Sequence, residues 1–111
     1  MAKDMTVAFL FDLYGELLSA RQREIFEGYY HEDLSLSELS EAYGITRQGV
    51  LQNIRSAENK LKETEKKLKL AESLLRNRKR AEGIQTLAAG IKEGSVGAQI
   101  ALLARQIWEE L

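Results

Sequence analysis

Apolar residues recur at helical spacing along most of the chain, and the first such run lies between residues 5 and 18. Phe9, Leu13 and Leu17 follow one another at intervals of four, and Leu10 and Tyr14 lie beside them. This pattern predicts a first helix of about four turns that is apolar over much of its circumference. Such a helix needs cover on more than one side.

Serines mark the starts of the next two predicted helices. Ser19 with Gln22 three residues later forms a capping-box pattern and predicts a second helix through Phe26, with an exit near His31. A third helix is expected to begin after a cap at Ser35 or Ser37.

The third and fourth predicted helices are joined by a very short link. Leu36, Leu39 and Tyr43 recur at helical spacing, Gly44 can adopt the left-handed conformation after a helix, and Thr46 is a good N-cap. Two helices that meet at so tight a corner form a helix-turn-helix.

The fourth predicted helix has a buried stripe and a polar remainder. The stripe contains Val50, Ile54, Ala57 and Leu61. Other faces carry residues expected to meet base edges and phosphates, namely Arg47, Gln48, Gln52, Arg55 and Asn59. An ordinary helical hairpin with a merely soluble surface would show a similar pattern.

The stripe continues with heptad spacing through Leu68 to Leu75, which predicts a helix of about 30 residues from Thr46 onward. Its far half needs cover, either from the C-terminal helix or from a second subunit. We expect packing within the chain together with added contacts between subunits, and hence a homodimer.

The C-terminal part is predicted to contain a break near Arg80 or Gly83, then a short helix and turn over residues 83 to 97. Ser95 is expected to cap a last helix. Its apolar stripe contains Val96, Ile100, Leu103, Ile107 and Leu111, with Leu102 and Trp108 beside it.

Composition supports an all-α fold, because the 111 residues contain no proline and are rich in helix-forming types. We expect one helical domain over residues 1–111, with a helix-turn-helix bundle over 1–61 and an extension with C-terminal helices over 62–111. The absence of cysteine fits a reducing compartment. The N-terminus resembles neither a signal peptide nor a membrane span, so we expect a cytoplasmic protein without membrane contact.

The net charge of −1 conceals a strong asymmetry. Residues 1 to 45 carry a net charge of −6, and residues 58 to 80 carry +5. The basic segment predicts a partner surface, although a short charge run is also typical of a solvated helix face. Its residues are Lys66, Lys67, Lys69, Arg76, Arg78, Lys79 and Arg80.

Catalytic chemistry has few candidates in this sequence. It contains a single histidine, His31, no cysteine, and no glycine-rich phosphate loop. We therefore expect neither an enzyme nor a bound metal or cofactor.

Three segments resemble the promoter-reading region 4 of sigma-70-type factors: LSARQREIF at 18–26, the tyrosine pair at 29–30, and LSLSELSEAYGIT at 34–46. In those factors the helix after this corner enters the major groove. The resemblance thus assigns Arg47, Gln48, Gln52 and Arg55 to base or phosphate contact.

A narrower resemblance is to the YlxM family of small bacterial proteins. It rests on TVAFLFDLYGELLS at 6–19, YYHEDLSLSELSE at 29–41 and TRQGVLQNIRSAENKL at 46–61. Members are encoded beside the signal recognition particle GTPase. The resemblance implies an accessory or regulator of that pathway, with its GTPase or RNA as partner. A DNA-binding transcription regulator is the alternative, and a purely structural helical oligomer ranks last.

Overall fold

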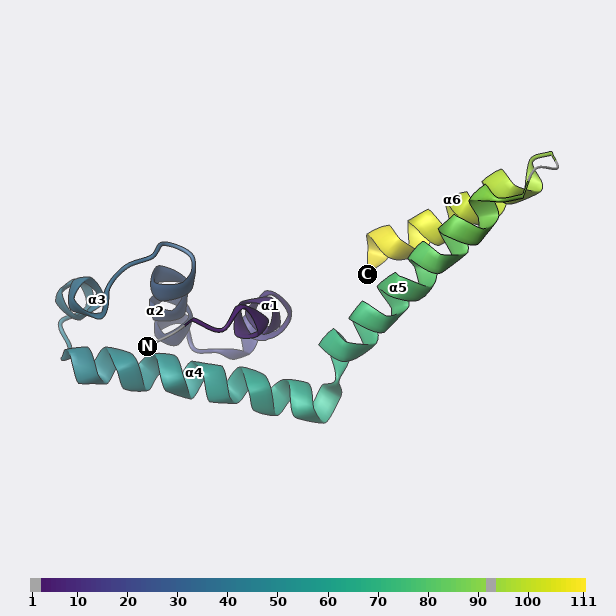
Figure 1. Cartoon of the computed structure of the whole chain (residues 1–111). Coiled ribbons are helices and arrows are strands. Elements are labelled where there is room, and N and C mark those ends of the chain that lie inside the picture. The colour runs from purple at the N-terminus through teal and green to yellow at the C-terminus, as the bar shows by residue number, and fades with distance from the viewer. Residues whose placement is uncertain (1–2, 92–93) are drawn as a thin grey trace. The chain divides into compact units, whose positions relative to one another are not determined.

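A computed structural model describes residues 3–91 and 94–111, and Figure 1 shows that this part of the chain is helical without a strand. The predicted all-α fold is confirmed. The chain consists of two compact units, and the boundary lies between Lys69 and Leu70. The sequence suggested a subdivision after residue 61. The helices are α1 (Met5–Tyr14), α2 (Ala20–Tyr30), α3 (Leu36–Tyr43), α4 (Arg47–Leu68), α5 (Leu70–Ala89) and α6 (Val96–Glu110), and a 3-10 turn, Gly15–Leu17, follows α1.

The first unit is built on α4, which packs against each of α1, α2 and α3. These three helices lie along one side of α4 in Figure 1. The predicted stripe of Val50, Ile54, Ala57 and Leu61 is confirmed, since each of these side chains is at most 1% exposed. Opposite it lie the other buried apolar residues of the unit, which include Val7, Leu10, Phe11, Ile25, Phe26 and Leu39.

Aromatic rings fill the space between α1 and α2. Phe11 stacks on Phe26 with ring centroids 4.5 Å apart, and Phe26 stacks on Tyr30 at 4.3 Å. Each such pair contributes about 0.5–1.5 kcal/mol beyond the area that it buries. The apolar circumference of the first helix is therefore covered by α2 as well as by α4.

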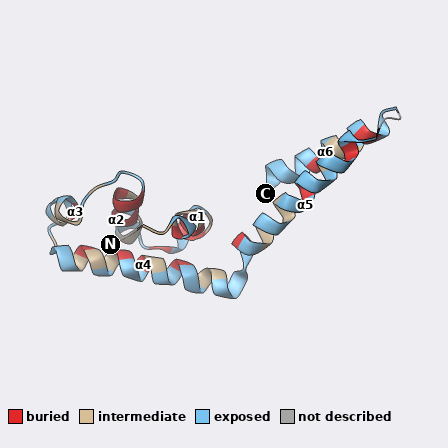
Figure 2. Ribbon diagram, viewed as in Figure 1, coloured by how far each residue is buried: buried red, intermediate tan, exposed pale blue. Residues whose placement is uncertain are grey.

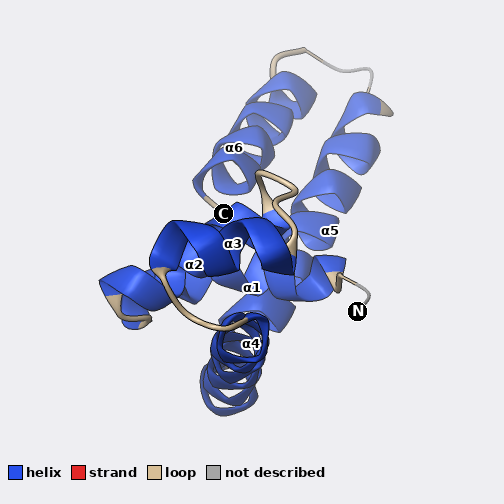
Figure 3. Cartoon of the chain, turned by 90° about the vertical axis from the view of Figure 1, so that its left-hand side faces the viewer, coloured by secondary structure: helices blue, strands red, loops and turns tan. Residues whose placement is uncertain are grey.

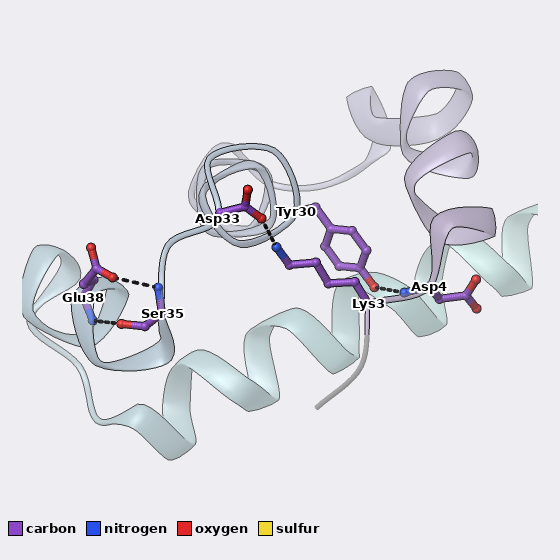
Figure 4. A network of polar contacts seen from close by, with 6 residues as sticks. All are labelled: Lys3, Asp4, Tyr30, Asp33, Ser35 and Glu38. Carbon is purple, nitrogen blue, oxygen red and sulfur yellow. Dashed lines mark hydrogen bonds and ion pairs between the residues drawn. The ribbon is translucent and has the colours of Figure 1, made fainter.

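The predicted caps have formed at three helix starts. The Ser19 hydroxyl accepts from the Gln22 N–H, and Ser35 rather than Ser37 caps α3. Ser35 and Glu38 make a full capping box, in which each side chain accepts a hydrogen bond from the other residue's backbone N–H (Figure 4). At the start of α4 the Thr46 hydroxyl accepts from the Gly49 N–H at 2.9 Å. These local signals are enough to fix where α2, α3 and α4 begin.

The predicted helix of about 30 residues is wrong, because α4 ends at Leu68 after 22 residues. Lys69 adopts the left-handed conformation, with φ 55°, and its N–H donates to the Glu65 carbonyl. Leu68 and Leu75, which the heptad seam would bury, are 55% and 49% exposed. Helix ends in the left-handed conformation usually carry glycine or asparagine. Because a lysine occupies this position, the sequence contained no signal for the end of α4.

The second unit is a hairpin of α5 and α6, which pack against each other. The predicted break near Arg80 or Gly83 is wrong, because α5 continues through both. Gly83 is exposed, and a helix of 20 residues tolerates its cost of about 1 kcal/mol. The turn does follow α5, but Lys92 and Glu93 within the predicted 83–97 segment lie outside the described residues.

The start and the packing of α6 also differ from expectation. Ser95 precedes α6, but its side chain makes no capping hydrogen bond. The side of α6 that meets α5 carries Gly97 and Ala104, both buried, instead of the predicted apolar stripe. A Cβ on Gly97 would lie 2.8 Å from the Ala88 carbonyl oxygen, so the two backbones approach closely. Small residues therefore form much of this contact, and many large apolar ones remain exposed. The ribbon of α5 and α6 is accordingly pale blue over much of its length in Figure 2.

Replacing Gly44 by alanine should destabilise the first unit. Gly44 has φ 64°, a conformation that costs an L-residue about 1–2 kcal/mol, and open space surrounds its Cβ position, so strain is the only added term. All four tyrosines lie in the first unit and the single tryptophan in the second. Urea unfolding followed by tyrosine near-UV circular dichroism should show the loss, while Trp108 fluorescence should not move.

Gly83→Ala is the matched control, because Gly83 is helical and its Cβ position is also open. Alanine there should stabilise the second unit by about 0.5–1 kcal/mol. A Gly44→Ala chain as stable as the wild type would contradict the left-handed corner.

A second prediction concerns Tyr30, which links three parts of the first unit. Its hydroxyl donates to Glu58 of α4 and accepts from the Asp4 N–H, and Figure 4 shows it beside the Lys3–Asp33 ion pair. Burial and the Glu58 carboxylate raise the pKa of the Tyr30 hydroxyl above its usual 10.0. Folding therefore favours the protonated phenol.

Tyr30→Phe should cost about 1–2 kcal/mol near neutral pH, because the Glu58 carboxylate loses its donor. The stabilisation by Tyr30 is fully present below pH about 10 and should decline as pH rises through the raised pKa. The unfolding free energies of the two chains should therefore converge as pH rises from about 8 to about 11, a range that spans the ordinary tyrosine pKa of about 10. A constant difference over that range would refute the link to Glu58.

Candidate nucleic-acid interface

The corner between α3 and α4 is fixed by short-range hydrogen bonds. Gly44 adopts φ 64° and ψ 33° at the end of α3, and the Ile45 N–H donates back to the Ser40 carbonyl at 3.2 Å. The Ser40 hydroxyl donates to the Ile45 carbonyl, so Ser40 and Ile45 are joined by two hydrogen bonds across the loop. Thr46 then starts α4 at once. The predicted corner is present, and it gives α3 and α4 the geometry of a helix-turn-helix.

One contact at this corner was not foreseen from the sequence. Arg21 of α2 donates to the Tyr43 carbonyl at 2.9 Å, and its guanidinium lies 5.9 Å from the Tyr43 ring centroid. Burial and the nearby Glu24 carboxylate raise the pKa of the Tyr43 hydroxyl. Arg21 therefore ties α2 to the last turn of α3 and positions the corner. No local sequence signal reports a contact over 22 residues.

All five residues predicted to meet nucleic acid are exposed on α4. At 100° per residue, four of them fall within about 60° of one another on the side roughly opposite the buried stripe. These are Gln48, Gln52, Arg55 and Asn59. Arg47 lies about 100° away from this line, in the first turn of the helix.

The same line continues along α4 to Lys62 and Lys66. We call this set the exposed strip, and it consists of Gln48, Gln52, Arg55, Asn59, Lys62 and Lys66. Its 18-residue reach corresponds to roughly 27 Å of helix. Lys62 approaches Asp4 at 3.7 Å, whereas Arg55 and Lys66 form no ion pair within the described residues. The strip offers donors along its whole length, with Glu63 at its edge.

The basic residues predicted as a partner surface are divided between the two units. Lys66, Lys67 and Lys69 end the first unit and are exposed, as are Arg76, Lys79 and Arg80 of α5 in the second. Within α5, Arg76 pairs with Glu72 at 3.1 Å, and Arg80 donates to the Asn77 side chain. Each group of cations belongs to its own unit.

Arg78 differs from the other cations of α5. It is partly buried, donates to the Leu111 carbonyl at 2.6 Å and lies 5.2 Å from the Trp108 ring centroid. Its Nε atom is buried without a hydrogen-bond partner in the described part of the chain. Arg78 therefore joins α5 to the end of α6.

Two other kinds of feature are absent among residues 3–91 and 94–111. No group of three or more histidine, cysteine, aspartate or glutamate side chains there is arranged to hold a metal ion. Within the same ranges, none of the helices combines the length and apolarity needed to cross a membrane.

The corner, the capped fourth helix and its exposed outer side define a helix-turn-helix protein. The sequence matches the model of the YlxM/p13-like helix-turn-helix family, UPF0122, over residues 1–96. The chain belongs to this family, and the resemblance seen in the sequence is confirmed.

Three curated relatives align with this chain over most of their length. A UPF0122 protein of Thermoanaerobacter sp. (strain X514) is 38% identical over 107 residues, which cover 93% of this chain and 92% of the relative. A UPF0122 protein of Acetivibrio thermocellus is 35% identical over 111 residues, covering 100% and 95%. YlxM of Bacillus subtilis is 34% identical over 93 residues, covering 84% of each chain.

Proposed function

We propose that this chain is a non-enzymatic helix-turn-helix accessory protein of the signal recognition particle pathway, which it regulates in the cytoplasm by binding the particle's RNA. Family membership supports the pathway, since the YlxM resemblance implies it. The observation that carries the choice of RNA is the exposed strip of α4, whose cations and amides face away from the buried stripe.

Two physical properties of the strip favour a nucleic-acid ligand. Cations displace counterions from phosphates, and the amide side chains of Gln48, Gln52 and Asn59 both donate and accept, as base edges require. The acidic residues of α1 to α3 lie in the same unit and repel phosphate elsewhere on its surface. A ligand is thereby directed to the strip.

Lys66 and Lys67 allow a matched test, because both are exposed in the last turn of α4 but differ in direction by about 100°. Lys66→Glu should weaken binding of the particle's RNA about tenfold, since it reverses a charge on the strip. Lys67→Glu should weaken it less. Fluorescence anisotropy with labelled RNA at two salt concentrations measures both effects, and salt should weaken binding by the wild type.

A pull-down from the source cell, with and without nuclease, separates RNA from the GTPase as the partner. Recovery of the particle that nuclease treatment abolishes supports RNA contact. Recovery that survives nuclease points to the GTPase, and indifference of RNA affinity to Lys66→Glu and to salt contradicts the strip.

A sequence-specific DNA-binding regulator is the second candidate function. The first three turns of α4 favour it, because Gln48, Gln52 and Arg55 lie on one line directly after a sigma-like corner. A recognition helix contacts base edges from its N-terminal residues in this manner.

If duplex DNA is the ligand, Gln48→Ala should relax sequence preference, because an amide reads a base edge. Arg55→Ala should weaken specific and non-specific binding alike, because a guanidinium contacts phosphate. Sequence selection followed by gel shifts at low salt measures both. Absence of any DNA binding would exclude the regulator and leave the accessory function untouched.

A further inference from the structure

The hairpin of the second unit buries small side chains and exposes large ones. Ala81 and Ala88 of α5 and Gly97 and Ala104 of α6 form the buried contact. Large apolar side chains remain 39% to 77% exposed, among them Ile84, Leu87, Ile91, Val96, Leu103 and Ile107. Two helices whose buried contact consists mainly of alanine and glycine bury little apolar area, and a unit of this size needs further cover to be stable.

Most of the strongly exposed apolar residues lie on one side of the hairpin, whereas Leu102 and Trp108 lie on the other. Ile84, Ile107 and Leu111 line a single shallow cavity of about 250 Å³, together with Asn77, Arg80 and Ala81. Leu103 lies one turn before Ile107 and extends the same surface. Ile91, just beyond the end of α5, lies beside Gly97 at the start of α6 and is 43% exposed. We call this surface the apolar face, and it consists of Ile84, Leu87, Ile91, Val96, Ile100, Leu103, Ile107 and Leu111.

The opposite side of the hairpin is more polar. Gln85 and Arg105 line a cavity there with Ala98, Ala101 and Leu102. Trp108 lies on this side too, where its indole N–H donates to Glu82 at 3.1 Å. The hairpin is thus amphipathic. Because only one of its sides is strongly apolar, we expect a partner to cover that side alone.

We propose that a second copy of this chain covers the apolar face, giving a two-fold homodimer in which two hairpins form a four-helix bundle. The sequence also predicted a homodimer, but through a heptad stripe of Leu61, Leu68 and Leu75 that the end of α4 interrupts. The apolar face replaces that stripe as the contact. A two-fold interface joins the same surface on both copies, so the apolar face of each copy packs against the apolar face of the other.

The area of the apolar face fits such a dimer. The six strongly exposed side chains amount to about three fully exposed ones, or roughly 500 Å² of apolar surface at about 150 Å² each. Homodimer interfaces are about 65% apolar, so this area corresponds to an interface of roughly 800 Å² per partner. That is the usual size of a stable protein interface.

The rim of the apolar face is complementary to itself in charge. On the α5 side the rim carries Arg76 and Arg80, and on the α6 side it carries Gln106 and Glu110. A two-fold axis parallel to the helices places α5 of one copy over α6 of the other. Arginines of one copy then lie near Glu110 of the second copy at the same end of the bundle.

Leu102 and Leu103 provide a matched pair for the test, since they are 55% and 60% exposed but differ in direction by about 100° around α6. Leu102 lines the cavity with Gln85 and Arg105, away from the apolar face. Sedimentation equilibrium of the full chain should give twice the chain mass of 12.6 kDa for the wild type. Leu103→Glu should reduce it to one chain mass. Leu102→Glu should leave it unchanged, and circular dichroism confirms that each chain is helical.

A wild type that sediments as one chain mass up to high micromolar concentration would overturn the dimer, and so would equal masses for the two glutamate variants. If Leu103→Glu does not fold, the milder pair Leu103→Ala with Ile107→Ala replaces it. This pair should raise the dissociation constant about tenfold or more, and Leu102→Ala should not. Equal dissociation constants would overturn the apolar face as the interface.

Discussion

The burial of one stripe of α4 is the constraint on which the rest of the first unit depends. Each of α1, α2 and α3 packs on this helix, and Val50, Ile54, Ala57 and Leu61 supply its contribution to the core. A helix that is buried along one side must present its other side to solvent. The packing that holds the unit together therefore also orients the exposed strip, and the caps at Ser35 and Thr46 fix the residues at which α3 and α4 begin.

The second unit obeys a different packing rule. Its helices approach through alanine and glycine, as the close contact of Gly97 with the Ala88 carbonyl shows, so its large side chains stay outside. The two helices in Figure 3 run side by side, in agreement with their contacts. Binding of nucleic acid and association of copies would then belong to different units, each with its own exposed surface. Substitutions within one unit therefore test the surface of that unit.

The sequence predicted those features that local chemistry determines. The corner at Gly44, the caps at Ser19 and Thr46 and the buried stripe of α4 each depend on residues within about three turns of one another, so spacing alone revealed them. The left-handed Lys69 gave no such signal, because its residue type is common within helices. The heptad pattern continued across it and led to a helix that was too long.

Long-range contacts account for the remaining differences. An amphipathic pattern shows that α6 has an apolar side but does not reveal what covers it, and α5 meets Gly97 and Ala104 instead. Arg78 resembled its basic neighbours in the sequence, yet Leu111 and Trp108 engage it from 30 or more residues away. The strip could be read from periodicity as far as Asn59. Lys66 was predicted instead as part of the basic partner surface, although it lies on the same line of α4.

The most direct test is side-chain NMR along α4. It shows whether the exposed side of this helix binds RNA while its buried side remains packed in the core. The measurement follows the side-chain amides of Gln48 and Gln52, the Arg55 guanidinium, and the methyl groups of Val50 and Ile54 while the particle's RNA is added. The strip predicts that the first three groups shift and that both methyl groups stay in place. Shifts confined to the methyl groups, or to residues of α1 to α3, would contradict a nucleic-acid interface on the exposed side of α4.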